Sequence, residues 1–264
     1  MIVESYEDVI YLSGALRSNF WETVHTAISL TLKRHPTGVI IECSGITECT
    51  PEGAETFRDI LVFIEEHDAR VICVGVPANV MEVLKQTPEV RSRLPVANTV
   101  EEARNSLDLL EHAEPAKRKA SHSDGRAKIV LLLTGDERDE QGLAAGKRIA
   151  DGLKGELVLT FVIVVPRDLP IQAPMPDQEE RAVGAMQAAQ QLLDSQGVPN
   201  SAVAERGRDV ASALESVIEE QKASFLLIPL SPDPAKVEDD LKLARSALTK
   251  VSAQVAFIRG PLRA

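Results

Sequence analysis

Aromatic residues, cysteines and long apolar runs are all scarce in this sequence. Aromatic side chains make up 3% of its 264 residues, so a core must be built from Val, Ile, Leu and Ala. No stretch approaches the roughly 18 apolar residues of a membrane span, and the first ten residues carry acids where a signal peptide needs bases. We therefore expect a cytoplasmic globular protein without a membrane partner.

Disulfide patterns and an excess of positive charge are lacking as well. The three cysteines, Cys43, Cys49 and Cys73, are an odd number without a Cys-x-x-Cys pair, which favours reduced core thiols over a disulfide or a zinc site. The net charge of −11, from 40 acidic and 29 basic residues, repels a nucleic-acid backbone. We expect no nucleic-acid partner.

Catalytic and metal-binding motifs are absent too. The sequence has no Gly-x-Gly-x-x-Gly, Gly-x-Ser-x-Gly or His-Glu-x-x-His, and its five histidines are scattered. The stretch from Gly142 to Arg148 imitates a P-loop, but it is one residue short between its glycines, and Arg148 stands where Ser or Thr must hold magnesium. We expect its small residues to pack on a sheet, and a protein that is not an enzyme and needs no metal or cofactor.

A polar stretch divides the chain near its middle. Residues 114–126, EPAKRKASHSDGR, lack apolar periodicity and are typical of an exposed linker. The sequence therefore predicts an N-terminal domain over residues 1–113 and a C-terminal domain over residues 127–264.

Both halves alternate strand and helix signals, which predicts an α/β fold. In the first half, apolar runs predict strands at residues 8–12, 39–43, 71–76 and near 96. In the second half, nearly continuous Val/Ile/Leu runs predict strands at residues 128–133, 156–165, 202–205, 225–230 and 254–259. We expect a sheet crossed by helices in the first half and a doubly wound, mainly parallel five-stranded sheet in the second.

Helix signals lie between these strands. Thr50 and Asp209 are placed to cap two of the helices. The apolar periodicity of the last helix predicts that its buried face carries Leu241, Ala244, Leu248 and Val251.

The segment VIIECSGITECTPEGAETF, residues 39–57, resembles the central strand and following loop of STAS domains, the fold of bacterial anti-sigma factor antagonists. In that family an apolar strand leads to an Asp, a Ser-Gly pair and an Asp-Ser-Ser-Gly tetrad that opens a helix. Here Glu42 replaces the first Asp, and the tetrad reads Thr-Pro-Glu-Gly. The resemblance implies a surface for an anti-sigma factor or kinase-like partner, formed by Ser44, Thr47, Thr50, Pro51, Glu52 and Gly53.

Glu52 occupies the tetrad position that a partner kinase phosphorylates in the family, and a glutamate has no hydroxyl to phosphorylate. Two interpretations stay open. In the preferred one, Thr50 as N-cap, Pro51 at the first helical position and Glu52 in the first turn simply make a good helix start. In the other, the fixed charge imitates the phosphorylated state. Thr50 and Ser44 keep hydroxyls that could accept phosphate, although capping and strand-end hydrogen bonds explain them as well.

The segment KIVLLLTGDE, residues 128–137, with the long apolar strand and the VAFIR strand that follow, resembles a universal stress protein domain. In that family the first strand commonly ends in Val-Asp-Gly-Ser, whose Asp contacts adenine, and ATP-binding members carry a glycine motif after the fourth strand. Here the corresponding residues, Thr134, Gly135 and Asp136, mark a possible ligand cleft that keeps only the glycine.

The glycine motif of the ATP-binding members is missing. No glycine lies between Gly207 and Gly260. Glycines adopt the positive φ angles that let a loop point its backbone amides at a phosphate, and this segment has none. We place Pro229, Pro232 and Pro234 in the loop after the fourth strand, where each removes a donor. We therefore expect that ATP does not bind in the family's manner.

The preferred hypothesis is a non-catalytic adaptor in stress or sigma-factor signalling that binds a protein partner through the STAS-like surface. The universal stress protein family often dimerises through its final strand, and residues 254–259, with Val255 and Phe257 on one side, have the apolar alternation for a homodimer. The alternative is a sensor of a nucleotide or other small molecule, in which the proline-rich segment 166–177 could cover the cleft. A hydrolase is the weakest of the three.

Overall fold

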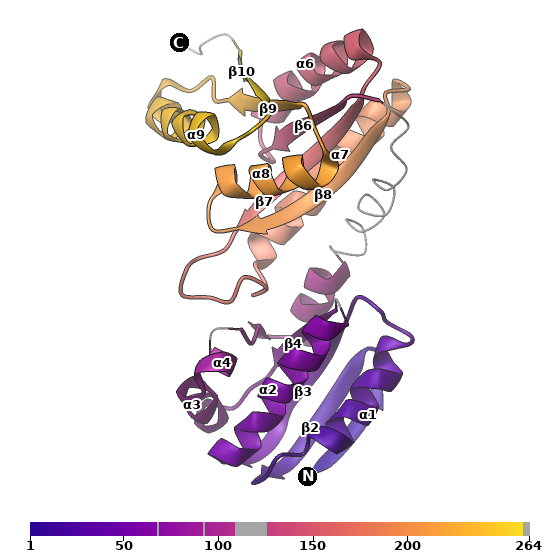
Figure 1. The fold of residues 1–264 in the computed structure, drawn as a ribbon, viewed down its shortest axis with the longest axis vertical. Helices are drawn as coiled ribbons and strands as arrows, with labels where there is room; N and C mark the ends of the chain where they lie inside the picture. Colours follow the sequence, from indigo (N-terminus) through magenta and orange to yellow (C-terminus); the bar gives the residue numbers. More distant parts are fainter. Residues whose placement is uncertain (68, 92, 109–125, 261–264) are drawn as a thin grey trace. The chain divides into compact units, whose positions relative to one another are not determined.

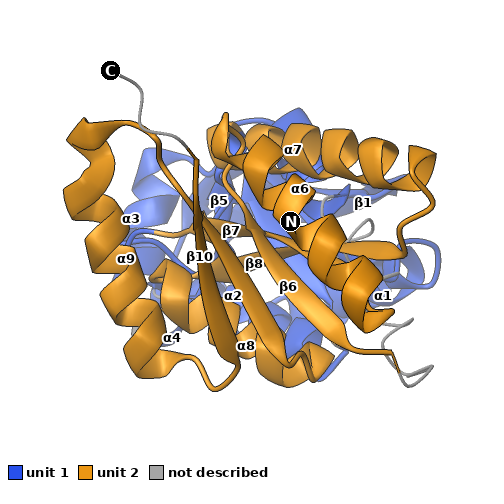
Figure 2. Cartoon of the chain, turned by 90° about the horizontal axis from the view of Figure 1, so that it is seen from above, with its two compact units in different colours: residues 1–108, 166–176 blue, residues 109–165, 177–264 orange. Residues whose placement is uncertain are grey.

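The computed structural model describes residues 1–67, 69–91, 93–108 and 126–260, drawn in colour in Figure 1. The chain forms two compact units (Figure 2). The first comprises residues 1–108 and 166–176, and the second comprises the described residues of 109–165 and 177–264. The expected linker, residues 114–126, lies outside the described residues except for its last position.

The first unit is a five-stranded sheet covered by helices. Its sheet order is β1-β2-β3-β4-β5, in which β1 runs antiparallel to β2 and the remaining neighbours are parallel. Residues 100–108 are also helical. The elements are β1 (Ile2–Tyr6), β2 (Val9–Leu16), α1 (Trp21–Leu32), β3 (Gly38–Cys49), α2 (Pro51–Glu66), β4 (Arg70–Val74), α3 (Ala78–Gln86), α4 (Pro88–Arg91) and β5 (Val96–Ala97).

Both faces of the central strands are buried in this unit. Successive strand residues point to opposite faces, so Ile41 packs among the residues of α1, α2 and α3, whereas its neighbour Ile40 packs with Ala103 and Leu107 of the helical segment 100–108. Two-sided burial explains why the strand sequences are continuous apolar runs.

Two strands of the first unit differ from the sequence-based expectation. β1 was not expected, because it is a short edge strand whose residues are almost all exposed, so IVESY lacks the continuous apolar run of the buried strands. β3 continues to Cys49 instead of ending at Cys43, because two register shifts keep it paired with β2. Gly45 lies at the first shift, where a side chain would collide with the carbonyl oxygen of Leu12.

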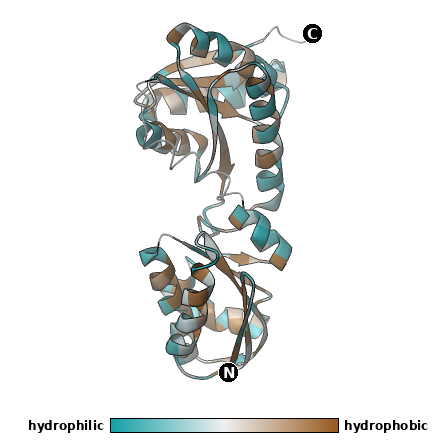
Figure 3. Cartoon of the chain, turned by 90° about the vertical axis from the view of Figure 1, so that its right-hand side faces the viewer, coloured by the Kyte–Doolittle hydropathy of each residue, from teal (hydrophilic) through white to brown (hydrophobic). Residues whose placement is uncertain are grey.

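The second unit is a fully parallel sheet with the strand order β10-β9-β6-β7-β8. This order confirms the expected doubly wound α/β class. Figure 3 shows the strongest hydrophobic colouring on the strands, as burial on both faces requires. The elements are β6 (Lys128–Leu133), α6 (Arg138–Leu153), β7 (Glu156–Val164), α7 (Pro176–Ser195), β8 (Asn200–Gly207), α8 (Val210–Gln221), β9 (Phe225–Leu230), the 3-10 turn Pro234–Lys236, α9 (Val237–Lys250) and β10 (Gln254–Arg259).

The helices of this unit follow local sequence signals in most places. Asp209 caps α8 by accepting a 3.0 Å hydrogen bond from the Ser212 backbone, as expected. The P-loop imitation lies on α6, where Gly142 packs on Leu131 and Gly146 packs on Leu157, also as expected. None of the described helices has the length and apolarity that a membrane crossing needs.

The expected buried face of α9 is wrong. Leu241 and Leu248 are 62% and 64% exposed, whereas Ala247 and Asp240 are buried. The helix is turned because Asp240 makes an inward hydrogen bond to the Ser231 backbone and small Ala247 packs against the core beside α8. A polar contact from elsewhere in the fold thus overrides the apolar periodicity of the helix.

The three cysteines are free and buried within the first unit. A hydrogen bond with Cys73, followed by burial, raises the pKa of the Cys43 thiol, and burial raises the pKa of Cys49 to about 11. Because the thiolate is the reactive form, Cys43 and Cys49 are inert core thiols.

Candidate functional site

The carboxyl ends of β6 and β9 form the edge of the second sheet where a ligand would bind. β6 and β9 are neighbours, but the chain continues from β6 to β7 on one side and from β9 to β10 on the other. Such a place is called a switch point, and open α/β sheets bind ligands there. Thr134 directly follows β6, and Ser231 directly follows β9. The expected cleft residues 134–136 therefore lie at the switch point.

The backbone amides at the end of β6 are held by an aspartate of the same unit. Asp139, in the first turn of α6, accepts a 2.8 Å hydrogen bond from the Thr134 amide through Oδ1 and another of 2.8 Å from the Gly135 amide through Oδ2. The hydroxyl of Thr134 lies 2.8 Å from Asp139 Oδ1 as well. Both amides are thus already hydrogen-bonded to a carboxylate of the same unit.

Asp136 and Arg138 form a two-point ion pair beside these amides. Arg138 Nε lies 2.9 Å from Asp136 Oδ1, and Nη2 lies 2.8 Å from Oδ2. Burial alone would raise the pKa of Asp136, but the hydrogen bonds from Arg138 and Thr134 outweigh it and hold the pKa far below its ordinary value. The carboxylate therefore stays ionised, and it repels a phosphate.

Asp240 repeats this arrangement at the end of β9. Its Oδ2 accepts a 2.8 Å hydrogen bond from the Ser231 amide, and its Oδ1 lies 3.7 Å from Arg138 Nη1. Arg181 donates to the Thr134 carbonyl at 2.9 Å. Because Arg138 contacts acids at both strand ends, one network of charged groups spans the switch point.

Two features of this edge were not visible from the sequence. Pro229 lies inside β9, paired with Ile258, so only Pro232 and Pro234 belong to the following loop. The roles of Asp139 and Asp240 were also missed. Both residues are acids in the first turn of a helix that follows a parallel strand. Such acids are common and indicate a helix start as readily as they indicate this network.

The residues expected to form a partner surface from the STAS resemblance lie at and before the start of α2 in the first unit. Thr50 Oγ1 accepts a 3.2 Å hydrogen bond from the Gly53 amide and donates a 3.0 Å hydrogen bond to the Arg17 carbonyl. Pro51 opens the helix, and Glu52 is exposed in the first turn. This is the geometry of a capped helix start, and phosphorylation of Thr50 would break it.

The other expected surface residues lie close by in the chain. Ser44 and Thr47 are exposed on β3, whereas Gly53 is buried. Two further residues at this surface were not expected from the sequence. Arg17, whose carbonyl binds Thr50, forms a 2.7 Å ion pair with Glu48. Asn79 donates a 3.2 Å hydrogen bond to the Thr47 carbonyl.

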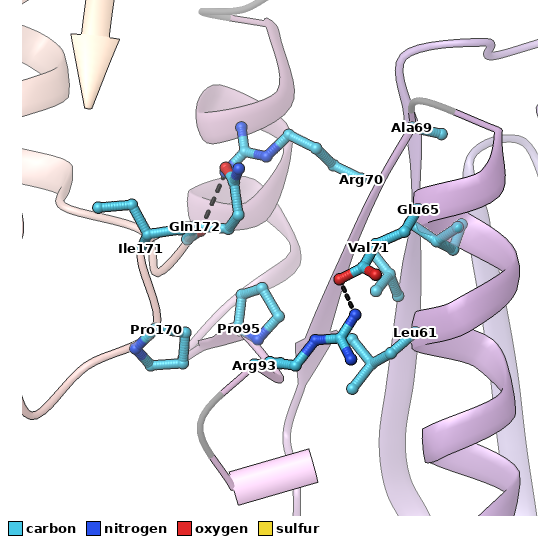
Figure 4. Close-up of a pocket in the computed structure, with 11 residues that line it drawn as sticks. Leu61, Glu65, Ala69, Arg70, Val71, Arg93, Pro95, Pro170, Ile171 and Gln172 are labelled. Carbon is cyan, nitrogen blue, oxygen red and sulfur yellow. Dashed lines mark hydrogen bonds and ion pairs between the residues drawn. The ribbon is translucent and has the colours of Figure 1, made fainter. Parts of the chain in front are cut away.

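A cavity of about 190 Å³ lies in the first unit, between α2, β4 and residues 170–172 (Figure 4). Arg70 points into its wall and donates to the Gln172 carbonyl at 3.0 Å and the Ser106 carbonyl at 2.8 Å, and Arg93 pairs with Glu65. The cavity is smaller than the roughly 300 Å³ of small-molecule sites, and both arginines already bind acceptors. The proline-rich segment 166–176 therefore belongs to the wall of this unit.

The last strand, β10, is an edge of the second sheet. Within the described chain it pairs with β9 alone, in parallel. Val255 and Phe257 are partly buried against the core cluster beneath α8 and α9. No group of His, Cys, Asp or Glu side chains in the described residues is arranged to hold a metal ion.

The class defined by these features is a two-unit α/β protein whose doubly wound sheet carries a network of charged groups at its switch point. No protein family matches the sequence, and neither does any curated protein. Among solved structures, the chain is similar to a protein of the universal stress protein family from Burkholderia pseudomallei, with 21% identity over 51% of this chain and 97% of that chain and a TM-score of 0.40.

Two further similar structures come from Archaeoglobus fulgidus. One is a universal stress protein in complex with dAMP, with 12% identity, 50% of this chain and 97% of that chain covered and a TM-score of 0.40. The other is a universal stress protein with 13% identity, 50% and 98% covered and a TM-score of 0.39.

Proposed function

We propose that this chain is a non-catalytic regulatory adaptor, which binds a protein partner through the STAS-like surface and forms a homodimer through the second unit. The observation that carries the proposal is the network at the switch point. Asp240 accepts from the Ser231 amide, in the segment where ATP-binding universal stress proteins carry their glycine motif, and Asp139 accepts from the Thr134 amide, at the position that contacts adenine in that family. A nucleotide would have to displace both carboxylates and enter a site of its own charge sign.

The dimer and the partner surface rest on separate features. β10 leaves one edge unpaired within the described chain, and a second β10 can extend the sheet across a two-fold axis. The start of α2 presents exposed Glu52 and Pro51 beside the exposed residues of β3. By its resemblance to STAS domains, the partner is an anti-sigma factor or a kinase-like protein.

Nucleotide binding is expected to be absent. Thermal unfolding of the full chain should be unchanged by ATP, AMP or cyclic nucleotides, whereas a ligand at 100 times its dissociation constant stabilises by about 2.7 kcal/mol. The measurement is a thermal-shift titration, with Thr134→Arg as the variant that blocks the switch point. A saturable shift for the natural chain that is lost in Thr134→Arg would favour the sensor over the adaptor.

Partner capture is expected to depend on the charge at the start of α2. If Glu52 is read by the partner, Glu52→Ser and Glu52→Ala should both change the yield and identity of captured proteins in an affinity pull-down followed by mass spectrometry. Glu66→Ala is the matched control, because Glu66 is an exposed acid at the opposite end of the same helix. Equal capture by all four forms would leave Glu52 with only its role in starting the helix.

A further inference from the structure

The strand β1 is an open edge of the first sheet. Within the described residues it pairs with β2 alone, in an antiparallel register that sets Glu4 opposite Tyr11. Its sequence IVESY contains neither Lys nor Pro, two residues that commonly protect edge strands from pairing with another chain. The edge is therefore able to accept a further strand.

The direction of the backbone groups in β2 follows from its pairing with β3. The carbonyl oxygen of Asp8 accepts a 3.0 Å hydrogen bond from the Ile40 amide, so it points toward β3. Backbone N–H and C=O groups alternate in direction along a strand, so Tyr11, three residues later, points its groups the other way, toward β1.

This alternation decides which groups of β1 face the open edge. Glu4 is the register partner of Tyr11, so its N–H and C=O groups are directed at β2. The backbone groups of its neighbours, Val3 and Ser5, therefore point outward. In an antiparallel pairing with a further strand, Glu4 occupies a non-hydrogen-bonded position, where facing side chains are closest.

The side chains on one face of β1 form an exposed patch. Ile2 and Tyr6 are 61% and 68% exposed, and the alternation of side chains places them on the same face as Glu4 between them. Tyr11, opposite Glu4, is 38% exposed and widens the patch. Val3 faces the other way and packs against the core beneath α1 and α2. Large apolar side chains thus lie on both sides of one carboxylate.

The carboxylate of Glu4 is available to a partner. Among the described residues it has no ion pair and no side-chain hydrogen bond. Arg104, on the helical segment 100–108, is already paired with Asp8 at 2.6 Å and with Glu7 at 3.4 Å. A basic side chain of another molecule is therefore complementary to the centre of the patch.

We propose that β1 binds an extended segment of a partner protein as an additional strand, with a Lys or Arg of that segment between two apolar residues at alternate positions. The segment hydrogen-bonds to the outward backbone groups of Val3 and Ser5. Its basic side chain faces Glu4, and its apolar side chains cover Ile2 and Tyr6. A second copy of β1 is a poor occupant, because the two-fold register that sets Ile2 against Tyr6 also sets Glu4 against Glu4.

The test compares two fluorescent peptides by anisotropy on the full chain. Each peptide alternates Thr with Val, and the central Val is replaced by Lys in one and by Glu in the other. The natural chain should bind the Lys peptide about tenfold more tightly than the Glu peptide, and Glu4→Lys should reverse this preference. Glu22→Lys on α1 is the matched control, since it makes the same change of charge at another exposed acid of this unit and should keep the natural preference.

Two further measurements distinguish strand addition from attraction by charge alone. At saturation with the Lys peptide, hydrogen exchange followed by NMR should slow at the amides of Val3 and Ser5 and change little at the amide of Glu4, which already faces β2. Ser5→Pro removes one outward N–H and keeps the pairing with β2, so it should weaken binding of the Lys peptide about tenfold or more while circular dichroism stays unchanged.

The contact goes beyond the proposed function, since it uses neither the STAS-like surface nor β10. Failure of both peptides to bind, or equal binding of the two, overturns it. Binding without slower exchange at Val3 and Ser5, or binding that survives Ser5→Pro, overturns the added strand. A dimer of the natural chain that Ser5→Pro abolishes would assign the edge to a second copy instead. The nucleotide titration and the Glu52 variants test the proposed function separately.

Discussion

Replacing Arg206 with Met is expected to lower the unfolding free energy of the second unit by about 3–5 kcal/mol. Arg206 on β8 forms an ion pair with Glu179 on α7, and their side chains are only 8% and 3% exposed. Removing Arg206 takes the ion pair away from a buried carboxylate, and less of the carboxylate's desolvation cost is then offset. Hydrogen exchange of the α7 and β8 amides should accelerate in proportion to the loss.

The double variant E179M/R206M controls for packing. It removes both charges and keeps apolar volume, so most of the stability should return. A loss below about 1 kcal/mol for Arg206→Met would mean that the pair is solvated and weak, as surface pairs are.

Replacing Gly53 with Ala is expected to destabilise the first unit by about 3 kcal/mol. The start of α2 packs so closely on the end of β2 that a methyl group at position 53 would overlap the carbonyl oxygen of Leu16. A backbone atom cannot move aside as a flexible side chain can, so the helix start must shift. Urea unfolding followed by Trp21 fluorescence reports this unit selectively, because the chain has one tryptophan.

Gly184→Ala, in an exposed turn of α7 in the second unit, is the control, and its stability is followed by hydrogen exchange of the α7 amides because Trp21 lies in the first unit. Nothing lies within 4 Å of a methyl group placed there, so this variant should gain about 0.5–1 kcal/mol from helix propensity. Opposite signs for the two glycines would establish that Gly53 is required for close approach and not for flexibility. Equal and small effects would show that the start of α2 is loosely packed.

Several elements could be predicted because their signals are local. Thr50 and Asp209 cap their helices through hydrogen bonds that reach only three residues along the chain. The strands of the second sheet are continuous apolar runs because both of their faces are buried. Such signals need no knowledge of which strands are neighbours.

The errors occur where distant residues decide the outcome. β3 runs six residues beyond its expected end at Cys43 because it stays paired with β2 through two register shifts. The face of α9 is set partly by Asp240, which contacts Ser231 and Arg138. The segment 166–176 belongs to the first unit, although its sequence position lies within the second half of the chain.

From its residues alone, the chain specifies alternating strands and helices, inert cysteines and a loop after β9 without glycine. The order of the strands decides everything at the candidate site, because it brings Thr134, Ser231 and their aspartates to one edge of one sheet. Side chains hydrogen-bond over about 3 Å, and only the folded sheet reduces a separation of some hundred residues to that distance.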